Sequence, residues 1–331
     1  MQSKAKSRRP LRIIAAVMAA LLILLAGFIA VSHLVWHRSA MATAVEIYFR
    51  LSRTKTKFSE PDACAAYIVD RANAPEYTFD TTRLKSTASA EQVNGADIWH
   101  LRKTDHPDYR ILYLHGGAYI NDASSYHWSF CDKLAQRLNA EIIFPIYPLT
   151  PNHTWEETFS LLEIVWQDVV VGADLPCIVM GDSAGGGLAV AFCEYIQELG
   201  WRQPDQMILL SPWMDISMSN TDAADYESVD PMLSAYGLIE MGKCWAGDLD
   251  IQDYKVSPIF GDISTLHDVY LFVGTREIFY PDIMRFHEML AKQGSITQLY
   301  IGEGMNHVYP LYPIPEAEDA MDTICGIISH L

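Results

Sequence analysis

Residues 181–186 read Gly-Asp-Ser-Ala-Gly-Gly and contain a Gly-x-Ser-x-Gly pattern, which is the most informative local signal in the sequence. The apolar run Cys177–Met180 precedes it and the apolar run Leu188–Ala191 follows it, which predicts a strand before the pattern and a helix after it. Between such elements the pattern makes a sharp turn that exposes the serine hydroxyl on a strained backbone. Glycines are needed there because a Cβ would clash where strand and helix cross. We therefore predict that Ser183 is a nucleophile; a glycine-rich turn with a helix-capping serine is the alternative.

Strand and helix patterns alternate on either side of this turn. Short runs typical of strands lie at 84–91, 96–102, 110–114, 141–145, 177–180, 207–210, 269–273 and 298–301. Helical periodicity covers 155–171, 183–198, 281–292 and 316–330. This alternation predicts an α/β fold in which a mostly parallel central sheet has helices on both faces. The irregular segment 213–258 is rich in Met, Trp and Tyr, and we expect it to be an insertion over the working edge of the sheet.

A His-Gly-Gly sequence at 115–117 directly follows another predicted strand. Consecutive glycines let backbone N–H groups point into a site without obstruction by side chains, and the N–H of the residue after a nucleophile can join them. We therefore predict that the N–H groups of Gly116, Gly117 and Ala184 bind the oxyanion of a tetrahedral intermediate. An ordinary turn is the alternative for the two glycines. His115 is expected to organise this loop rather than to act as the base.

A serine nucleophile needs a histidine that accepts its proton, and after a Gly-x-Ser-x-Gly turn this histidine comes late in the chain. The histidines beyond the turn are His267, His287, His307 and His330. Among them His307 alone lies in a glycine-bearing loop after a predicted strand, within Gly302–Tyr309. His287 falls inside a predicted helix and His330 is terminal, so both are expected to be structural. We therefore predict that His307 is the general base.

The carboxylate that orients this histidine should follow the preceding strand, Val269–Val273. Two acids lie beyond that strand, and both remain open. Glu277 lies in the loop at the carboxyl end of the strand and is favoured. Asp282 is better placed to stabilise the first turn of the next helix, where a negative charge is favourable.

The N-terminal segment 13–36 is apolar apart from Ser32 and His33, and its 24 residues are enough to cross a bilayer as a helix. The basic residues within 1–12 should remain cytoplasmic. We therefore predict a single-pass membrane anchor that places residues 39–331 outside the cytoplasm. The alternative is a signal peptide that is cleaved near Ala42 or Ala44, which would release a secreted protein. Two further helices are expected, at 41–51 and 61–72.

Composition excludes some classes of function. Half of the 331 residues are hydrophobic and a fifth are charged, as in a globular protein with a sizeable core. The net charge is −17 in total but +6 within residues 1–38, so residues 39–331 carry −23 and would repel nucleic acid. The six cysteines show no paired or metal-like spacing, and no His-Glu-x-x-His pattern occurs, so neither a metal nor another cofactor is expected. The oligomeric state is left open.

The chain resembles the hormone-sensitive-lipase branch of the α/β-hydrolases, the bacterial family IV esterases, over roughly residues 108–310. Residues 181–186 match that family's Gly-Asp-Ser-Ala-Gly-Gly signature in full, and His115–Ala118 is similar to its His-Gly-Gly-Gly signature. Further segments that look like the family are Tyr147–His153, Ser211–Asp215 and Ser257–Phe260.

This resemblance implies an α/β-hydrolase fold and a serine hydrolase that cleaves small carboxylic esters with short- to medium-chain acyl groups. It also implies a helical cap, here within residues 37–80, over a catalytic domain at 81–331. Position by position it implies Ser183 as nucleophile, His307 as base, and Gly116, Gly117 and Ala184 as oxyanion donors. The sequence departs from the family in two places: Ala118 replaces the third glycine, and Glu277 stands where the family usually has Asp.

The sequence is also compatible, to different degrees, with other functions. An amidase, a peptidase or a formamidase-like hydrolase would use the same residues, so motifs separate these enzymes poorly from an esterase. Ser52–Lys55 is a Ser-x-x-Lys match to penicillin-binding proteins, but no Lys-Thr-Gly sequence follows it. A non-catalytic binding protein on this fold would be expected to lack a member of the triad, whereas candidates for all three members are present.

Overall fold

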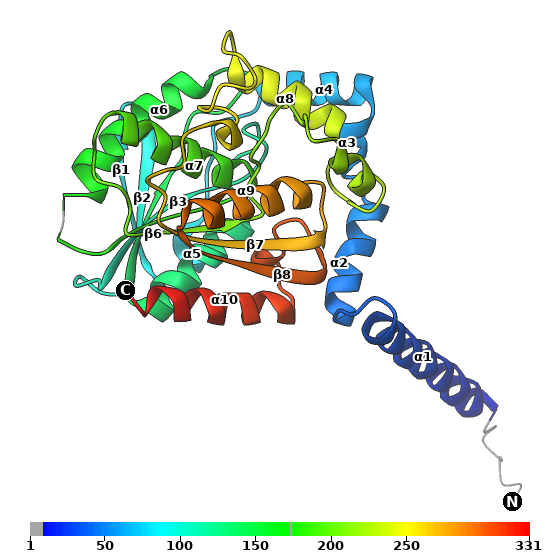
Figure 1. Cartoon of the computed structure of the whole chain (residues 1–331). Helices are drawn as coiled ribbons and strands as arrows, with labels where there is room; N and C mark the ends of the chain where they lie inside the picture. The colour runs from blue at the N-terminus through cyan, green and yellow to red at the C-terminus, as the bar shows by residue number, and fades with distance from the viewer. Residues whose placement is uncertain (1–8, 173) are drawn as a thin grey trace, which may run out of the picture.

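An eight-stranded sheet lies at the centre of the computed structural model, which describes residues 9–172 and 174–331 (Figure 1). The strands are β1 Thr87–Val93, β2 Ala96–Arg102, β3 Tyr109–Leu114, β4 Ala140–Pro145, β5 Cys177–Asp182, β6 Gln206–Leu210, β7 Asp268–Arg276 and β8 Ile296–Asn306. Their order is β1-β2-β4-β3-β5-β6-β7-β8. The pairs β1·β2 and β2·β4 are antiparallel and all the others are parallel. The predicted mostly parallel sheet is confirmed.

Helices cover both faces of this sheet. The α-helices are α1 Arg9–Leu34, α2 Ala40–Leu51, α3 Thr56–Ser59, α4 Pro61–Ala72, α5 Ser125–Leu138, α6 Trp155–Ile164, α7 Ser183–Glu198, α8 Ala235–Ala246, α9 Tyr280–Gln293 and α10 Pro315–Ile328. Short helical turns are η1 Thr81–Arg83, η2 Val165–Val170, η3 Thr221–Tyr226, η4 Pro258–Phe260 and η5 Tyr309–Leu311. Successive side chains of a strand point to opposite faces, so Leu112 joins the core beneath α6, α7 and α9, whereas Ile111 and Tyr113 join the core beneath α5 and α10.

Two elements differ from the predictions. Helix α5 was missed, although its buried residues Trp128, Cys131, Leu134 and Leu138 repeat with helical spacing. Within the predicted helix at 155–171, α6 gives way to the π-helical turn η2. The expected helices near 41–51 and 61–72 are present as α2 and α4. None of the six cysteines is in a disulfide, and all six lie within the described residues.

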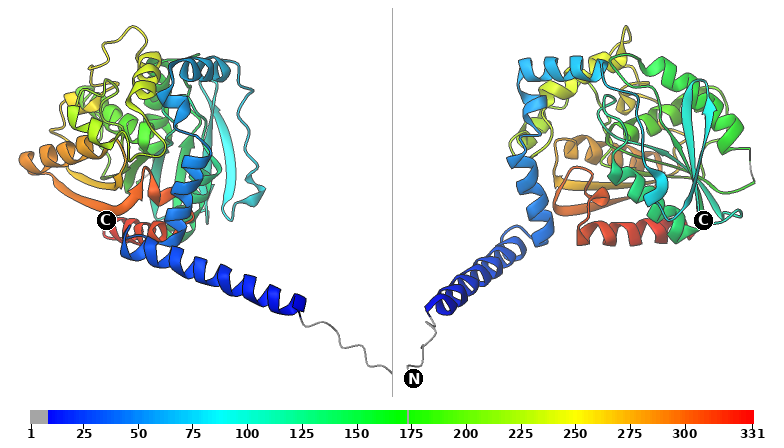
Figure 2. Two further views of the ribbon diagram at one scale, coloured as in Figure 1. Left: turned by 90° about the vertical axis from the view of Figure 1, so that its right-hand side faces the viewer. Right: turned by 180° about the vertical axis from the view of Figure 1, so that it is seen from behind.

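The segment 213–258 and the N-terminal helices meet on one side of the sheet. Helix α8, which belongs to this segment, contacts both α3 and α4. The approach of α8 to α3 is close, because a Cβ on Gly237 would lie 2.4 Å from the Cα of Phe58. Helices α2 to α4 therefore pack alongside the rest of the molecule and do not form a separate lobe, as both views of Figure 2 show.

Helix α1 leaves the body and packs little against it (Figures 1 and 2). The stretch Arg12–Leu34 has 23 residues and a mean hydropathy of 2.9, and none of its apolar window is buried against the rest of the chain. It is long and apolar enough to cross a membrane, and a signal sequence would meet the same criteria. Of the basic residues in front of it, Lys4, Lys6 and Arg8 lie outside the described residues.

Candidate active site

Ser183 sits at the turn from strand β5 into helix α7, with a φ of 51°. This left-handed conformation is unusual for a residue with a Cβ and marks a strained backbone. A Cβ on Gly181 would lie 2.4 Å from the carbonyl oxygen of Gly185. A Cβ on Gly185 would lie 2.1 Å from the carbonyl oxygen of Leu114 in β3. The flanking glycines therefore let α7 pass close to the sheet, and the turn places the Ser183 hydroxyl at the edge of the sheet.

His307 follows directly after β8, which is longer than predicted and ends at Asn306. Its Nε2 lies 2.9 Å from Ser183 Oγ, and its Nδ1 lies 2.5 Å from Glu277 Oε2. In the tautomer with the proton on Nδ1, the imidazole donates to the carboxylate and accepts from the hydroxyl. All three side chains are buried. The structure thus brings together three predicted residues that lie far apart in the sequence.

Glu277 is fixed by neighbouring donors, and Asp282 points elsewhere. The second oxygen of Glu277, Oε1, accepts hydrogen bonds from the Ser211 hydroxyl at 2.8 Å and from the Gly274 N–H at 2.6 Å. Asp282 lies in the first turn of α9 and accepts a hydrogen bond from the Asn220 side chain at 2.8 Å. Of the two acids left open by the sequence, Glu277 is the one that contacts His307.

Ser211 is a residue of the site that the sequence argument missed. It follows β6 directly and has a φ of 49°. Its hydroxyl donates to Glu277 and accepts a hydrogen bond from the N–H of Val308 at 3.0 Å. Ser211 therefore ties the loop of the acid to the loop of the histidine. Its position after a strand parallel to β5 and β7 was the available signal, because the carboxyl ends of parallel strands share one edge of the sheet.

The electrostatic surroundings of His307 favour its charged form. Burial alone would lower the pKa of the imidazole, but the hydrogen bond and charge of Glu277, with the more distant carboxylates of Asp230 and Asp182, raise it above its ordinary value of 6.5. Asp230 is fully buried and accepts a hydrogen bond from the N–H of Ile278 at 3.0 Å, next to Glu277. An imidazolium that forms transiently beside these carboxylates would be stabilised.

The His-Gly-Gly loop offers a partly different set of N–H donors from the predicted one. The N–H of Gly116 donates to Asp182 Oδ1 at 2.9 Å and is therefore already engaged. The N–H groups of Gly117 and Ala118 have no acceptor within the part of the chain that the structure describes. Both residues have positive φ values, of 130° and 55°, and both line the cavity that contains Ser183. Ala118 was not among the predicted donors, and its place in the family-like signature was the available signal.

Two buried side chains hold this loop in place. Asp182 accepts hydrogen bonds from the Tyr113 hydroxyl at 2.9 Å, from Gly116 and from His127 Nε2 at 3.2 Å. Burial raises the pKa of Asp182, but His127 and the hydrogen bonds outweigh it, so the net shift is downward and the carboxylate stays charged. His115 donates through Nδ1 to the carbonyl of Gly116 at 2.8 Å, and burial lowers its pKa to about 4. This geometry suits a neutral organiser of the loop.

A cavity of about 290 Å³ opens onto Ser183 and His307. Its volume is at the lower end of the range of about 300–1,000 Å³ that is typical of small-molecule sites. Most of the lining is apolar. Aromatic and aliphatic side chains from α2, α3, α5 and the segments near 232 and 311 contribute, namely Phe49, Phe58, Tyr126, Met232, Leu233, Val308, Leu311 and Tyr312. The Ser183 hydroxyl therefore faces a small, mostly apolar pocket between the sheet and the N-terminal helices.

Comparisons with known proteins show which family this chain is similar to. A family model described as the alpha/beta hydrolase fold matches residues 111–311. An esterase from Acinetobacter venetianus is 31% identical over 228 residues, which are 67% of this chain and 75% of that protein. A solved structure from Staphylococcus aureus is 29% identical, with a TM-score of 0.78, over 83% of this chain and 95% of that one. An esterase structure from the bacterial hormone-sensitive lipase family is 21% identical, with a TM-score of 0.74, over 87% of this chain and 97% of that one; at this identity the likeness concerns the fold.

Proposed function

Because this chain belongs to the α/β-hydrolase family and is a carboxylic-ester hydrolase, we propose that it cleaves its ester through an acyl-enzyme formed on Ser183. One observation carries the proposal: an unbroken line of hydrogen bonds from Ser183 through His307 to Glu277. A serine hydroxyl is a weak nucleophile until an adjacent base takes its proton, and a third group must orient that base.

In the proposed reaction His307 accepts the proton of Ser183 as the hydroxyl oxygen attacks the ester carbonyl. The negative charge that develops on the carbonyl oxygen is stabilised by the N–H groups of Gly117, Ala118 and Ala184. Each donor of this kind is typically worth about 10²–10³ in rate. The protonated His307 then gives its proton to the leaving alcohol, and a water activated by the same imidazole releases the acid. Gly116 contributes by holding Asp182 rather than by donating to the substrate.

The pH dependence of the reaction follows from this role of His307. The base works only as a neutral imidazole, and its pKa in the free enzyme is raised above 6.5. We therefore expect kcat/KM to fall as the pH drops, with a midpoint above 6.5. Replacing Asp230 by asparagine removes one of the charges that raise the pKa, so its profile should shift to lower pH. A wild-type midpoint below 6.5 would contradict the assignment.

The acyl group is proposed to occupy the apolar cavity next to Ser183. The cavity's volume of about 290 Å³ supports a short- to medium-chain acyl group rather than a long one. A series of p-nitrophenyl esters from acetate to palmitate tests this directly: kcat/KM should peak among the shorter chains and decline before palmitate. The matched p-nitroanilides, which carry an amide in place of the ester, should be turned over far more slowly. A maximum at palmitate, or anilides cleaved as fast as esters, would refute this substrate class.

We also propose that α1 is retained as a single-pass membrane anchor, with residues 39–331 outside the cytoplasm and residues 37–80 as linker and cap. Support comes from the residues around the expected cleavage points, which pack into the body of the enzyme. Arg38 donates to the carbonyl of Gly304 at 2.9 Å, and both the N–H and the hydroxyl of Ser39 donate to Glu316. Ala42 is buried. Amino-terminal sequencing of the membrane-bound protein tests this; a chain that begins beyond Ala42 would contradict it.

A further inference from the structure

Helix α2 exposes four large apolar side chains and buries its one acidic side chain. Met41, Tyr48 and Leu51 are 52%, 66% and 79% exposed. Ile47, beside Tyr48, is 41% exposed. Residues separated by three, four or seven positions lie on one side of a helix, so these four side chains form a single stripe, which we call the outer face of α2. Val45 and Phe49, on the other side of the helix, pack against the core, so α2 carries a second apolar surface that faces away from the body.

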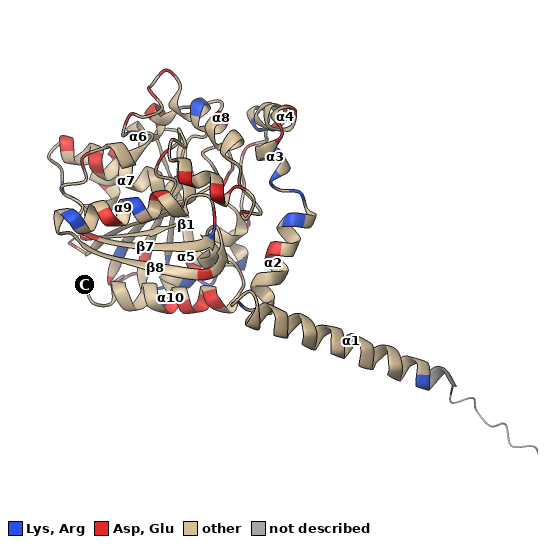
Figure 3. Cartoon of the chain, turned by 45° about the vertical axis from the view of Figure 1, so that its right-hand side comes forward, with Lys and Arg blue, Asp and Glu red and all other residues tan. Residues whose placement is uncertain are grey.

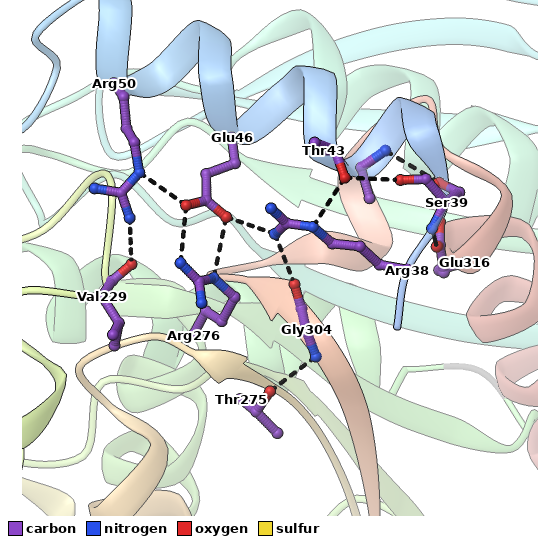
Figure 4. Close-up of polar contacts among 11 residues, drawn as sticks. Arg38, Ser39, Thr43, Glu46, Arg50, Val229, Thr275, Arg276, Gly304 and Glu316 are labelled. Carbon is purple, nitrogen blue, oxygen red and sulfur yellow. Dashed lines mark hydrogen bonds and ion pairs between the residues drawn. The ribbon is translucent and has the colours of Figure 1, made fainter. Parts of the chain in front are cut away.

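The inner face of α2 carries Glu46, which is bound by three arginines (Figure 4). Arg276 donates to it through Nε at 3.0 Å and through Nη2 at 2.9 Å. Arg38 and Arg50 also pair with it. Burial raises the pKa of the Glu46 carboxyl, but the bonds to Arg276, Arg38 and Arg50 outweigh burial and bring its pKa down to about 2. The Glu46 carboxylate therefore stays charged. The free-energy cost of removing it from water is offset only while its bonds to the three arginines are in place.

This ion cluster fixes the rotation of α2 about its own axis. Arg276 is the last residue of β7 and immediately precedes Glu277, and Arg38 also donates to Gly304 at the end of β8. Turning α2 so that its outer face packed against the body would pull Glu46 away from all three arginines. The body therefore cannot bury the apolar stripe without breaking the ion cluster.

Continuity with α1 indicates what covers the stripe. Helix α1 ends at Leu34 and α2 begins at Ala40, and both views in Figure 2 show α1 leaving the body at the base of α2. The connecting residues Leu34, Val35 and Trp36 are exposed at 76%, 61% and 41%. If α1 spans the bilayer, α2 begins within a few residues of its surface, where Trp and Tyr side chains such as Trp36 and Tyr48 are favoured.

The charges next to the outer face fit a lipid surface as well. Residues 50–57 contain Arg50, Arg53, Lys55 and Lys57 and no acid, in a domain whose net charge is −23 (Figure 3). Arg50 and Lys55 pair with Glu46 and Glu227. Arg53 forms no ion pair within the described part of the chain, whereas Lys57 lies toward the cavity, with its Nζ 4.6 Å from the centre of the Tyr67 ring. Unpaired basic side chains beside an apolar stripe are typical of helices that lie in the membrane interface.

The cavity of the site is lined from the same stretch of chain. Phe49 on α2, with Thr54, Lys57 and Phe58 just beyond it, lines the cavity that contains Ser183. We propose that the outer face of α2 and the adjacent Arg53 lie against the lipid surface, and that the enzyme takes esters of lipophilic alcohols directly from the bilayer. The acyl group enters the cavity while the alcohol chain remains in the lipid. This inference rests on the proposed esterase function and on α1 as a membrane span.

The test uses the full chain in phosphatidylcholine vesicles and two substrates with the same acyl group. Hexadecyl acetate partitions into the bilayer, whereas p-nitrophenyl acetate is delivered from water. A variant with Met41→Gln, Tyr48→Gln and Leu51→Gln is expected to lose at least about tenfold of its hexadecyl acetate turnover, since three apolar side chains no longer favour the lipid. Its p-nitrophenyl acetate turnover should stay within about twofold, as for other surface substitutions.

A matched control removes exposed apolar side chains elsewhere. Ile296 at the start of β8 and Leu199 after α7 are 65% and 42% exposed, and the variant Ile296→Gln with Leu199→Gln should keep both activities. Adding phosphatidylglycerol should raise hexadecyl acetate turnover in the wild type and less in Arg53→Gln. If the triple variant proves unstable, Tyr48→Gln alone, checked by circular dichroism, should show a smaller loss confined to the lipid substrate.

The outcomes separate this inference from the proposed function. Equal hexadecyl acetate turnover by the wild type and the triple variant overturns the lipid-facing surface while leaving the esterase intact. Absence of p-nitrophenyl acetate turnover in the wild type overturns the proposed function itself. A dimer that the outer-face substitutions convert to monomer, seen by cross-linking in detergent, would show that a second copy of the chain covers the stripe and would also overturn the lipid proposal.

Discussion

Replacing Ser183 by alanine is expected to lower kcat for p-nitrophenyl ester hydrolysis by about 10⁴–10⁶-fold, because no other oxygen occupies the position from which the acyl-enzyme forms. The residual rate would come from binding and from the backbone donors alone. Folding should be preserved, since alanine keeps the Cβ that Ser183 already carries at its φ of 51°. The measurement is the kcat of the purified wild type and of purified Ser183→Ala, with circular dichroism of the same samples to check that both are folded.

Ser52 provides the control for this variant. It opens the Ser-x-x-Lys match, and its side chain is exposed near the end of α2, where its hydroxyl donates to the carbonyl of Phe49 at 3.1 Å. Ser52→Ala should therefore retain turnover within about twofold of the wild type. Unchanged turnover in Ser183→Ala, or a loss in Ser52→Ala of comparable size, would contradict the proposed nucleophile.

The second large effect is expected at Glu277. Replacing it by glutamine preserves its shape and still offers an oxygen to the Ser211 hydroxyl and the Gly274 N–H. The charge that stabilises the imidazolium is lost, and the amide can hold His307 in the wrong tautomer, so kcat should fall by about 10⁴-fold. Glu277→Asp keeps the charge but withdraws it by one methylene, and it should retain much more activity than Glu277→Gln.

Asp282→Asn separates the two acids that the sequence left open. Asp282 is bonded to Asn220 in the first turn of α9, away from His307, so its amide variant should keep kcat within a few-fold of the wild type. Measuring kcat for Glu277→Gln and Asp282→Asn in parallel shows which of the two acids orients His307. An equal or larger loss in Asp282→Asn would mean that the orienting carboxylate has been misassigned.

Residues that follow strands were the most predictable part of the site. Ser183, Glu277 and His307 each come after an apolar run, and the carboxyl ends of parallel strands meet at one edge of the sheet. Local sequence was enough to find them, because the pattern that makes each strand also sets the direction in which its end points. Ser211 likewise follows a strand, β6. A single serine is common in turns, however, so it could not be identified as a site residue without knowing that it contacts Glu277.

Features that depend on contacts between distant segments could not be predicted. That the N–H of Gly116 is engaged by Asp182, rather than free for a substrate, depends on how β3 and β5 lie side by side. The helical pattern of residues 41–51 predicted α2 but not which of its faces is buried. That choice depends partly on Arg276, which is distant in sequence and holds Glu46 on the same side as the packed residues Val45 and Phe49. Helix α5 was missed for a local reason, since its apolar spacing was present in the sequence.

Helix α2 connects three parts of the structure. It follows the apolar helix α1, it contributes Phe49 to the cavity, and its Glu46 holds the residue next to Glu277. The structure therefore connects α1, through α2, to Arg276 next to Glu277 and to the cavity at Ser183.

The most direct test of the proposed mechanism is the mass of the acylated enzyme. A slowly deacylating p-nitrophenyl carbamate, or a fluorophosphonate, should add one acyl or phosphonyl group per chain, and peptide mapping should place it on Ser183. The Ser183→Ala variant should remain unmodified under the same conditions. A group found on any other side chain, or undiminished labelling of Ser183→Ala, would contradict the account.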